Sequence, residues 1–342
     1  MTPDPLVSIV MPVFNPPEER FRHCLDSVVG QSCEQFELLL VDDGSNESTK
    51  RIIHDYLRDD QRISCISSGH RGPAAARNIG TQAVRGQYVT YVDSDDAIPG
   101  YTLERMVETS EKHHAQVAFG LCSNVSSYAD ELPVYGSNAL LDEREIDGLL
   151  DYVLAGSSRP FFHGGQRYNL LIGPVASLVD AKLAKKLSFP EDVFISEDTL
   201  WMISMLKVVE TIAISRDVWY WRWLNEGSLA HSFQPRIYDN SVEFMKELRL
   251  LEKEPGRMLK KEFILARGLG EVNRVAKNYA RQEWSGANSP EMRNPGDLLK
   301  EDSFSDLLTA ENILNGGPSI LLKTILIKTG LVVPFWKYAS TR

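Results

Sequence analysis

The chain has 342 residues, 43% of them hydrophobic and 25% charged, which is enough to bury a full core and is typical of a globular domain with a smaller appended part. Its formal charge of −10 argues against nucleic-acid binding, which needs a basic surface. Four scattered cysteines without a CxxC pair predict reduced, mostly buried thiols in a cytoplasmic protein. The N-terminus does not resemble a signal peptide and no apolar run reaches ~18 residues, so we expect any membrane contact to be peripheral.

Short apolar runs alternate with helical periodicity in the N-terminal part of the chain. The apolar runs predict four strands, at Val7–Val13, Phe36–Val41, Ile63–Ile66 and Tyr88–Val92. Helices are expected over Phe21–Val29, near Ser48 as a capping residue, and from about Pro73. Nearly uniform apolar strands separated by helices indicate an α/β fold, with a mostly parallel sheet covered by helices on both faces.

The rest of the chain is less regular. A helix from Leu103, strands near Val117–Leu121 and Pro174–Leu178, a helix from about Asp198 and an aromatic strand from Val218 are expected. Segment 123–167 is predicted to form loops and short helices, and segment 236–281 to be mostly helical. We therefore expect one domain over residues 1–232, with a first half at about 1–122 and a second half at about 123–232. A helical C-terminal region would cover 233–342.

Polar residues in the first part share one position, directly after a predicted strand. They are Asn15, Asp42 and Asp43, the loop at 69–77, and the acids Asp93, Asp95 and Asp96. Right-handed crossovers bring such strand ends to one edge of the sheet, where ligands bind in open α/β folds. Close carboxylates repel one another unless a cation lies among them, and hard oxygen ligands suit Mg²⁺ or Mn²⁺. A solvated acidic turn is the alternative.

Five stretches, in order and at suitable spacing, resemble the family 2 glycosyltransferases of the GT-A fold. They are VSIVMPVFN, LLLVDDGSNEST, GPAAARNIG, YVDSDD and ISEDTLW. The resemblance is dense up to the acids after Tyr88, resumes near Glu197 and thins after His231. It implies a Rossmann-like GT-A domain over residues 1–232, whose first half (about 1–122) binds the donor and whose second half (about 123–232) binds the acceptor. It also implies a nucleotide diphosphate sugar donor bound with Mn²⁺ or Mg²⁺, and transfer with inversion at the anomeric carbon.

The resemblance also assigns donor-binding positions. Those that match the family's nucleotide and diphosphate site are Pro12, Val13, Asn15, Asp42, Asp43, Gly72, Arg77, Asn78, Asp93 and Ser94. Asp43, or its neighbour Asp42, matches the acid that binds a uracil-type ring. Arg77, near a helix start, would offer a fork of donors to the diphosphate. An arginine paired with a carboxylate is the alternative.

The metal ligands follow from the same resemblance. Asp93 and Asp95 match the family's DxD motif, in which one acid meets ribose and another holds the metal. We favour Asp95 as the ligand, with Asp96 beside it. His231 matches a position near the diphosphate or metal, so it is a candidate third ligand through a neutral imidazole; a structural loop histidine is the alternative. The cation would offset repulsion between diphosphate and acids and stabilise charge on the leaving nucleotide.

The stretch Ser196-Glu197-Asp198 matches the family's ED motif. Direct inverting displacement needs a base on the acceptor side, and a carboxylate within hydrogen-bond reach of the acceptor hydroxyl serves that role. We predict Asp198 as this base, with Glu197 orienting the acceptor or acting as a substitute. Acids that merely favour a helix N-terminus are the alternative.

Two further segments, the tryptophan-rich strand and the C-terminal tail, each allow two interpretations. Trp219, Trp221 and Trp223 alternate along the predicted strand, where core packing is favoured over stacking on a sugar or lipid. The tail at 318–342 has basic and apolar residues but no acid, which suits the surface of an anionic membrane. Packing on the domain or on a second subunit is the alternative for the tail.

These features predict a cytoplasmic glycosyltransferase, peripheral at the inner face of the plasma membrane. Its donor would be a UDP-sugar carrying a hexose or N-acetylhexosamine, and its acceptor a cell-surface polysaccharide, teichoic acid or lipid-linked glycan. A sugar nucleotidyltransferase is disfavoured because such an enzyme uses a Gly-rich loop with a basic residue right after its first strand, and the loop here is NPPEERF. A catalytically inactive binding or assembly subunit is disfavoured because Asp95 and Asp198 are present.

Overall fold

The computed structural model describes residues 4–125, 138–156, 161–163, 166–168, 170–171, 173–223, 234–285, 293, 295–304 and 309. The chain divides into two compact units. Unit 1 comprises residues 1–147 and 160–224, and unit 2 comprises residues 148–159 and 225–342. The domain limits inferred from the sequence stay predictions, and the short segment 148–159 groups with the C-terminal part of the chain.

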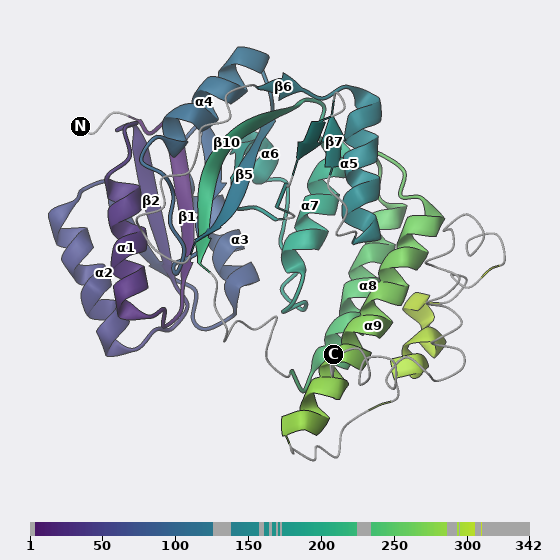
Figure 1. Cartoon of the computed structure of the whole chain (residues 1–342). Coiled ribbons are helices and arrows are strands. Elements are labelled where there is room, and N and C mark those ends of the chain that lie inside the picture. The colour runs from purple at the N-terminus through teal and green to yellow at the C-terminus, as the bar shows by residue number, and fades with distance from the viewer. Residues whose placement is uncertain are drawn as a thin grey trace. The chain divides into compact units, whose positions relative to one another are not determined.

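Unit 1 contains an eight-stranded sheet with the strand order β3-β2-β1-β4-β9-β5-β10-β6 (Figure 1). Its strands are β1 (Val7–Val13), β2 (Phe36–Asp42), β3 (Ile63–Ser67), β4 (Tyr88–Tyr91), β5 (Val117–Val125), β6 (Ala139–Leu140), β9 (Ser177–Asp180) and β10 (Ile212–Trp223). β1 pairs in parallel with β2 and β4, β2 with β3, and β5 with β10. β9 is antiparallel to β4 and β5, and β6 is antiparallel to β10. This mostly parallel sheet confirms the predicted α/β fold.

Helices cover the sheet of unit 1. α1 (Glu18–Val29) and α2 (Glu47–Asp59) lie on one face and α3 (Pro73–Ala83) on the other (Figure 1). The other helices of unit 1 are α4 (Thr102–His113), α6 (Ala181–Ala184) and α7 (Glu197–Val208), while α5 (Glu143–Ala155) begins in unit 1 and continues in unit 2. β7 (Phe161–His163) and β8 (Gln166–Tyr168) form a separate antiparallel pair. Every residue of β2 is buried, which explains its nearly continuous apolar sequence.

Two local predictions are wrong. α2 is capped by Asn46, whose side-chain oxygen accepts a hydrogen bond from the Thr49 N–H over 3.0 Å, and not by Ser48. A capping residue must precede the first helical residue, and Ser48 lies inside the first turn. The described thiols are free, but Cys24 is the buried one and Cys65 is exposed, because Cys65 lies on the edge strand β3.

The strand predicted at Pro174–Leu178 forms later, at β9, and runs against its neighbours. Val179 of β9 lies opposite Val89 of β4 and Val117 of β5. The apolar residues give burial on both faces, but an apolar run carries no signal for strand direction. β9 therefore separates the parallel group that contains β4 from the parallel pair of β5 and β10.

Unit 2 is helical in its described residues. It contains the end of α5, α8 (Ile237–Lys253), α9 (Lys261–Ser285) and two 3₁₀ helices, Pro295–Lys300 and Asp302–Phe304. Buried Arg267 of α9 donates hydrogen bonds to the carbonyl oxygens of Val153 and Leu154, which satisfies the end of α5. No helix in the described ranges is long and apolar enough to cross a membrane. The predicted basic tail at 318–342 and His231 lie outside the described residues.

Candidate functional site

The carboxylate of Asp43, directly after β2, organises the loop that leads into α3. Asp43 is 4% exposed, and it accepts hydrogen bonds from the Ser68 hydroxyl and from the backbone N–H groups of Arg71 (2.7 Å) and Gly72 (2.9 Å). The His70 Nδ1 atom lies 3.0 Å from the Asp43 carbonyl oxygen. His70 and Gly72 have φ values of 63° and 91°, in the left-handed region that the hydrogen bonds to Asp43 stabilise. Asp43 thus fixes the loop shape.

An exposed aromatic pair lies beside this loop. Phe14, directly after β1, is 49% exposed, and its ring centroid is 4.7 Å from that of His70. Asn15, with φ of 48°, links the end of β1 to the next strand end, since its side-chain oxygen accepts a hydrogen bond from the Asn46 N–H over 2.8 Å. Sequence reasoning missed Phe14 and His70. A large apolar residue placed among polar ones directly after a strand is the signal that could have found Phe14.

The other residues predicted to bind the nucleotide sugar differ in burial and in hydrogen bonding. Pro12 is half-buried at the end of β1, and Val13 beside it is fully buried. Asp42 turns inward and accepts a hydrogen bond from the Ser45 N–H over 2.9 Å. The Asn78 side chain exchanges hydrogen bonds with the backbone of Phe189 at 2.8 and 2.9 Å. Asn78 therefore holds the segment before α7 against α3, so its amide is not directed at the acids after β4.

The residues after β4 form a turn that we call the acid turn, residues 93–96. The Asp96 N–H donates a hydrogen bond to the Asp93 carbonyl oxygen over 3.1 Å. Directly after the turn, Ala97 and Trp221 of β10 exchange two backbone hydrogen bonds, at 2.8 and 3.0 Å. The acid turn is therefore attached to β10, although β10 is not a neighbour of β4 in the sheet.

The side chain of Asp96 is buried against the same strand. Its carboxylate accepts hydrogen bonds from the Tyr220 hydroxyl and from the Trp223 N–H, both at 2.8 Å. The Tyr220 hydroxyl in turn accepts one from the Asp93 N–H over 3.1 Å. Burial, followed by the negative charge of Asp93, raises the pKa of Asp96 to about 7. Asp96 is thus held in place by β10 and is readily protonated.

The three alternating tryptophans of β10 do not share one environment. Trp219 is fully buried, and a Cβ atom at Gly120 of β5 would lie 2.2 Å from its ring. Trp221 and Trp223 are half-buried. Core packing, which the sequence favoured for the three tryptophans, applies to Trp219.

The guanidinium of Arg77 joins the acid turn to the start of α7. Arg77, in α3, is 7% exposed. Its Nη2 donates to Asp93 Oδ1 and its Nη1 donates to Glu197 Oε1, both over 2.9 Å. Its Cζ atom lies 5.5 Å from the centre of the Phe189 ring. Burial disfavours the charge, but Asp93 and Glu197 outweigh it and raise the pKa of Arg77, so the side chain stays protonated.

Asp198 is the second residue of α7. The preceding Ser196 has φ of 73°, an unfavourable conformation for serine of the kind found at functional sites. Asp198 Oδ1 accepts hydrogen bonds from the Thr199 N–H (2.7 Å) and the Thr199 hydroxyl (3.3 Å). Burial, partly offset by Arg77, raises the pKa of Asp198. A raised pKa suits a carboxylate that must accept a proton near neutral pH.

The acid turn can accommodate a divalent cation as part of a larger ligand set. In the portion of the chain that the structure describes, no group of three or more His, Cys, Asp or Glu is arranged to hold a metal ion. Ser94 and Asp95 are half-buried in the turn. After burial, repulsion from Asp93 and Asp95 contributes to the raised pKa of Asp96, and a cation would relieve that repulsion. Mg²⁺ commonly uses one or two carboxylates and leaves positions for phosphate oxygens, so the acid turn fits such an ion.

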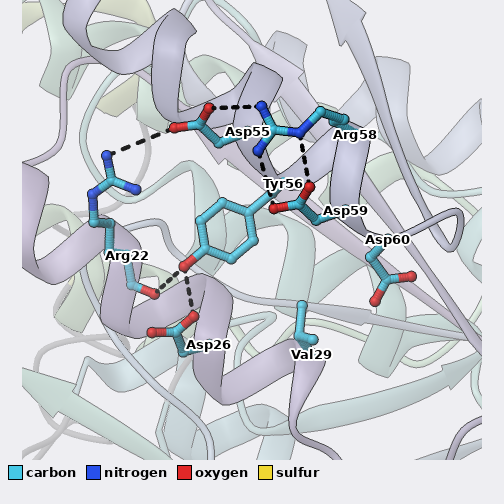
Figure 2. Close-up of a pocket in the computed structure, with 8 residues that line it drawn as sticks. All are labelled: Arg22, Asp26, Val29, Asp55, Tyr56, Arg58, Asp59 and Asp60. Atoms are coloured by element: carbon cyan, nitrogen blue, oxygen red, sulfur yellow. Dashed lines mark hydrogen bonds and ion pairs between the residues drawn. The ribbon is translucent and has the colours of Figure 1, made fainter.

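A cavity of about 490 Å³ lies between α1 and α2, and none of its lining residues belongs to the predicted site. Figure 2 shows these residues, which are Arg22, Asp26, Val29, Asp55, Tyr56, Arg58, Asp59 and Asp60. The Tyr56 hydroxyl donates to Asp26, and Arg58 pairs with Asp55 and Asp59. Because these charged groups are largely paired with one another, we do not assign a catalytic or ligand-binding role to this cavity.

Comparisons with known proteins agree with the motifs. Residues 8–160 match the family model for glycosyl transferase family 2. The uncharacterized glycosyltransferase EpsJ of Bacillus subtilis (strain 168) is 35% identical over 113 residues, which cover 33% of each chain. The poly(ribitol-phosphate) beta-glucosyltransferase of Bacillus spizizenii is 25% identical over 297 residues, 81% of this chain and 43% of that protein. The chain therefore spans less than half the length of these curated relatives.

The fold also matches solved structures. Residues 1–349 of TarS from S. aureus superpose with a TM-score of 0.64 at 17% identity, covering 98% of this chain and 92% of that one. The complex of the same TarS segment with UDP-GlcNAc gives a TM-score of 0.62. The sheet order, the family match and this likeness of fold confirm the resemblance that the five motifs indicated: residues 8–160 match glycosyltransferase family 2, and the chain adopts the GT-A fold.

Proposed function

We propose that this chain is an inverting, metal-dependent glycosyltransferase whose donor is a nucleotide diphosphate sugar, with UDP as the favoured nucleotide. The observation that carries the proposal is that Asp93 and Glu197, which are remote in sequence, bind the same guanidinium. A turn with the oxygen ligands for a cation therefore lies close to a carboxylate, Asp198, that can act as a base. TarS, which has the same fold, was solved with UDP-GlcNAc, and this supports UDP.

Donor binding is assigned to the residues that follow β1, β2 and β3. Phe14 and His70 offer an aromatic surface to the nucleotide base, and Asp43 holds the loop that carries His70. Half-buried Pro12 and Gly72, exposed Asn15, and half-buried Ser94 after β4 complete this donor surface, while buried Val13 and Asp42 hold the strand ends that carry it. Backbone N–H groups near the start of α3 suit the diphosphate.

The acid turn is assigned to the cation. Asp95 and Asp96 would hold Mn²⁺ or Mg²⁺, with His231 as a candidate further ligand. When bound, the ion would supply Lewis-acid stabilisation for charge on the leaving nucleotide. Tyr220 and the Trp223 N–H orient the Asp96 carboxylate. Asp93 is assigned to the ribose.

Asp198 is assigned to the proton transfer. It accepts the proton of the acceptor hydroxyl while that oxygen attacks the anomeric carbon on the face opposite the nucleotide. The bond from the anomeric carbon to the diphosphate oxygen breaks, and its electron pair leaves with the nucleotide. This single displacement inverts the anomeric configuration. Thr199 fixes the Asp198 carboxylate through two hydrogen bonds.

The acceptor is proposed to be a teichoic acid, a cell-surface polysaccharide or a lipid-linked glycan. The name of the Bacillus spizizenii relative, a poly(ribitol-phosphate) glucosyltransferase, supports this class. The basic, acid-free sequence at 318–342 suits a cytoplasmic protein peripheral to an anionic membrane. Removal of residues 318–342 should reduce co-sedimentation with phosphatidylglycerol vesicles and leave neutral vesicles unaffected.

Calorimetry with UDP, GDP and dTDP, each with and without Mn²⁺, tests the donor assignment. We expect UDP to bind most tightly and to require Mn²⁺. Binding of GDP or dTDP in preference to UDP would correct the nucleotide. Equal binding with and without Mn²⁺ would remove the metal from the proposal, and failure of all three nucleotides to bind would reject the enzymatic function.

A further inference from the structure

Arg77 has a sequence position that the family resemblance assigns to donor binding, but its side chain is engaged elsewhere. Both terminal nitrogens donate to carboxylates of other segments, Asp93 and Glu197. We propose that Arg77 is a positioning residue, which fixes the acid turn relative to the start of α7 and does not bind the diphosphate of the donor. The inference rests on the proposed function, because it concerns how the cation site and the base are held together.

The surroundings of Arg77 leave little access for a ligand. The residue is 7% exposed, and each Nη atom already has a carboxylate oxygen at 2.9 Å. Its Nε is buried and has no hydrogen-bond partner among the described residues, and the Phe189 ring lies 5.5 Å from Cζ. An arginine that binds a diphosphate must direct N–H groups that have no protein partner into the solvent-filled site. Arg77 instead presents its terminal N–H groups to the protein.

The two carboxylates that Arg77 binds are each one or two residues from a proposed reacting group. Asp93 starts the turn that contains Asp95, and its N–H donates to Tyr220 of β10. Glu197 is the first residue of α7 and immediately precedes Asp198. Because one guanidinium binds both carboxylates, it sets the separation between the proposed base and the proposed metal ligand.

The bridge needs an arginine. A guanidinium can donate to two carboxylates on different segments at once, whereas a lysine ammonium is a compact charge that cannot span both in the same geometry. Removing the positive charge would also leave the buried Glu197 carboxylate and the partly exposed Asp93 carboxylate without their cation, so the acid turn and α7 would move apart. Misplacement of about 1 Å is enough to slow catalysis about 100-fold.

The test compares Arg77→Met, Arg77→Lys and a matched control, Arg62→Met. Arg62 forms a half-buried ion pair with Asp60 just before β3, at the opposite ends of the strands. Calorimetry with UDP and Mn²⁺ measures donor binding, and UDP release from UDP-GlcNAc is the probe of turnover. We expect Arg77→Met to keep the Kd for UDP–Mn²⁺ within about threefold and to lower kcat about 100-fold, with KM little changed. Arg77→Lys should be intermediate, and Arg62→Met should match the wild type in both.

A second measurement needs no ligand. Thermal unfolding of Arg77→Met, Glu197→Gln and the double variant forms a double-mutant cycle. If Arg77 and Glu197 interact, the double variant should lose less Tm than the two single variants lose in sum. Additive losses would overturn the inference even if the donor proposal holds. A Kd for UDP–Mn²⁺ raised tenfold or more in Arg77→Met, with Tm unchanged, would also overturn it and return Arg77 to the diphosphate. Failure of the wild type to bind any nucleotide would count against the proposed function, and the unfolding cycle would still decide whether the bridge exists.

Discussion

The hydroxyl of Tyr220 donates a 2.8 Å hydrogen bond to the carboxylate of Asp96, and both side chains are buried. Tyr220 belongs to β10 and Asp96 follows β4, and two strands, β9 and β5, lie between these in the sheet. The contact therefore ties the acid turn to a distant strand. Its cost is that a carboxylate is kept in a poorly solvated place, where burial raises its pKa to about 7.

Replacement of Asp96 by Asn should change how stability depends on pH. A carboxyl group whose pKa is raised on folding binds its proton more tightly in the folded state, so metal-free wild type should lose stability as pH rises from about 4 to about 7. The loss of unfolding free energy is at most about 4 kcal/mol, because the pKa of Asp96 rises by about three on folding. Asp96→Asn should lack this loss. Urea unfolding in EDTA at about pH 5 and about pH 8 measures it.

Mn²⁺ provides the control for this comparison. A cation beside the acid turn favours the ionised carboxylate, so Mn²⁺ should restore wild-type stability above pH 7 and have less effect on Asp96→Asn. Parallel pH dependence of the two proteins in EDTA would show that Asp96 does not carry the raised pKa.

Replacement of Asp198 by Asn should separate binding from chemistry. Loss of a general base lowers turnover by about 10²–10⁴-fold, while UDP–Mn²⁺ binding should stay within a few-fold of wild type. Because burial raises the pKa of Asp198 and only the ionised form accepts a proton, wild-type turnover should fall as pH drops through that raised pKa. The variant should lack this acidic limb. Weakened nucleotide binding equal to the loss of turnover would undo the assignment.

Replacement of Asp95 by Ala should remove the metal-dependent part of nucleotide binding. The half-buried Asp95 is the favoured ligand, and an alanine offers the cation no oxygen. UDP titrations with and without Mn²⁺ should then coincide for the variant and differ for the wild type. Asp59→Ala, in the cavity between α1 and α2, is the control and should behave as wild type. An Mn²⁺ effect that survives in Asp95→Ala would move the metal site elsewhere.

Two glycines should respond in opposite directions to alanine. At Gly120 a Cβ atom would lie 2.2 Å from the ring of buried Trp219, so Gly120→Ala should lower the free energy of unfolding by about 1–3 kcal/mol. At Gly148, in α5, a Cβ atom meets nothing within 4 Å, so Gly148→Ala should raise it by about 0.5–1 kcal/mol. Urea unfolding of both variants measures the difference. Equal effects would mean that the packing at Trp219 is loose.

The N-terminal strands could be predicted because burial on both faces leaves a continuous apolar run. The run Val7–Val13 coincides with β1, and Phe36–Val41 falls one residue short of β2. Helix capping was less predictable, since Asn46 and Ser48 are both good capping residues and only the start of α2 distinguishes them. The direction of β9 could not be predicted, because residue type does not report which way a buried strand runs.

The sequence indicated candidate positions for the site but not the contacts between them. The polar residues after strands indicated Asp43 and Asp93, and the resemblance to the family's ED motif indicated Asp198. The sequence could not show that Arg77 pairs with Glu197, because that contact depends on how α7 returns to the sheet. It could not show either that the Asn78 amide binds the backbone of Phe189.

The reversed direction of β9 has a consequence for how the sequence around the site can vary. Because β9 opposes its neighbours, the chain enters β9 at the edge where β4 and β5 end. Gly173 lies on this entering segment, with φ of 154°, and a Cβ atom there would be 3.4 Å from Asp198 Oδ2. A side chain at position 173, upstream of β9, would thus contact the same carboxylate that the loops downstream of the other strands approach. Substitutions in that segment can change the surroundings of Asp198 while every recognised motif stays intact.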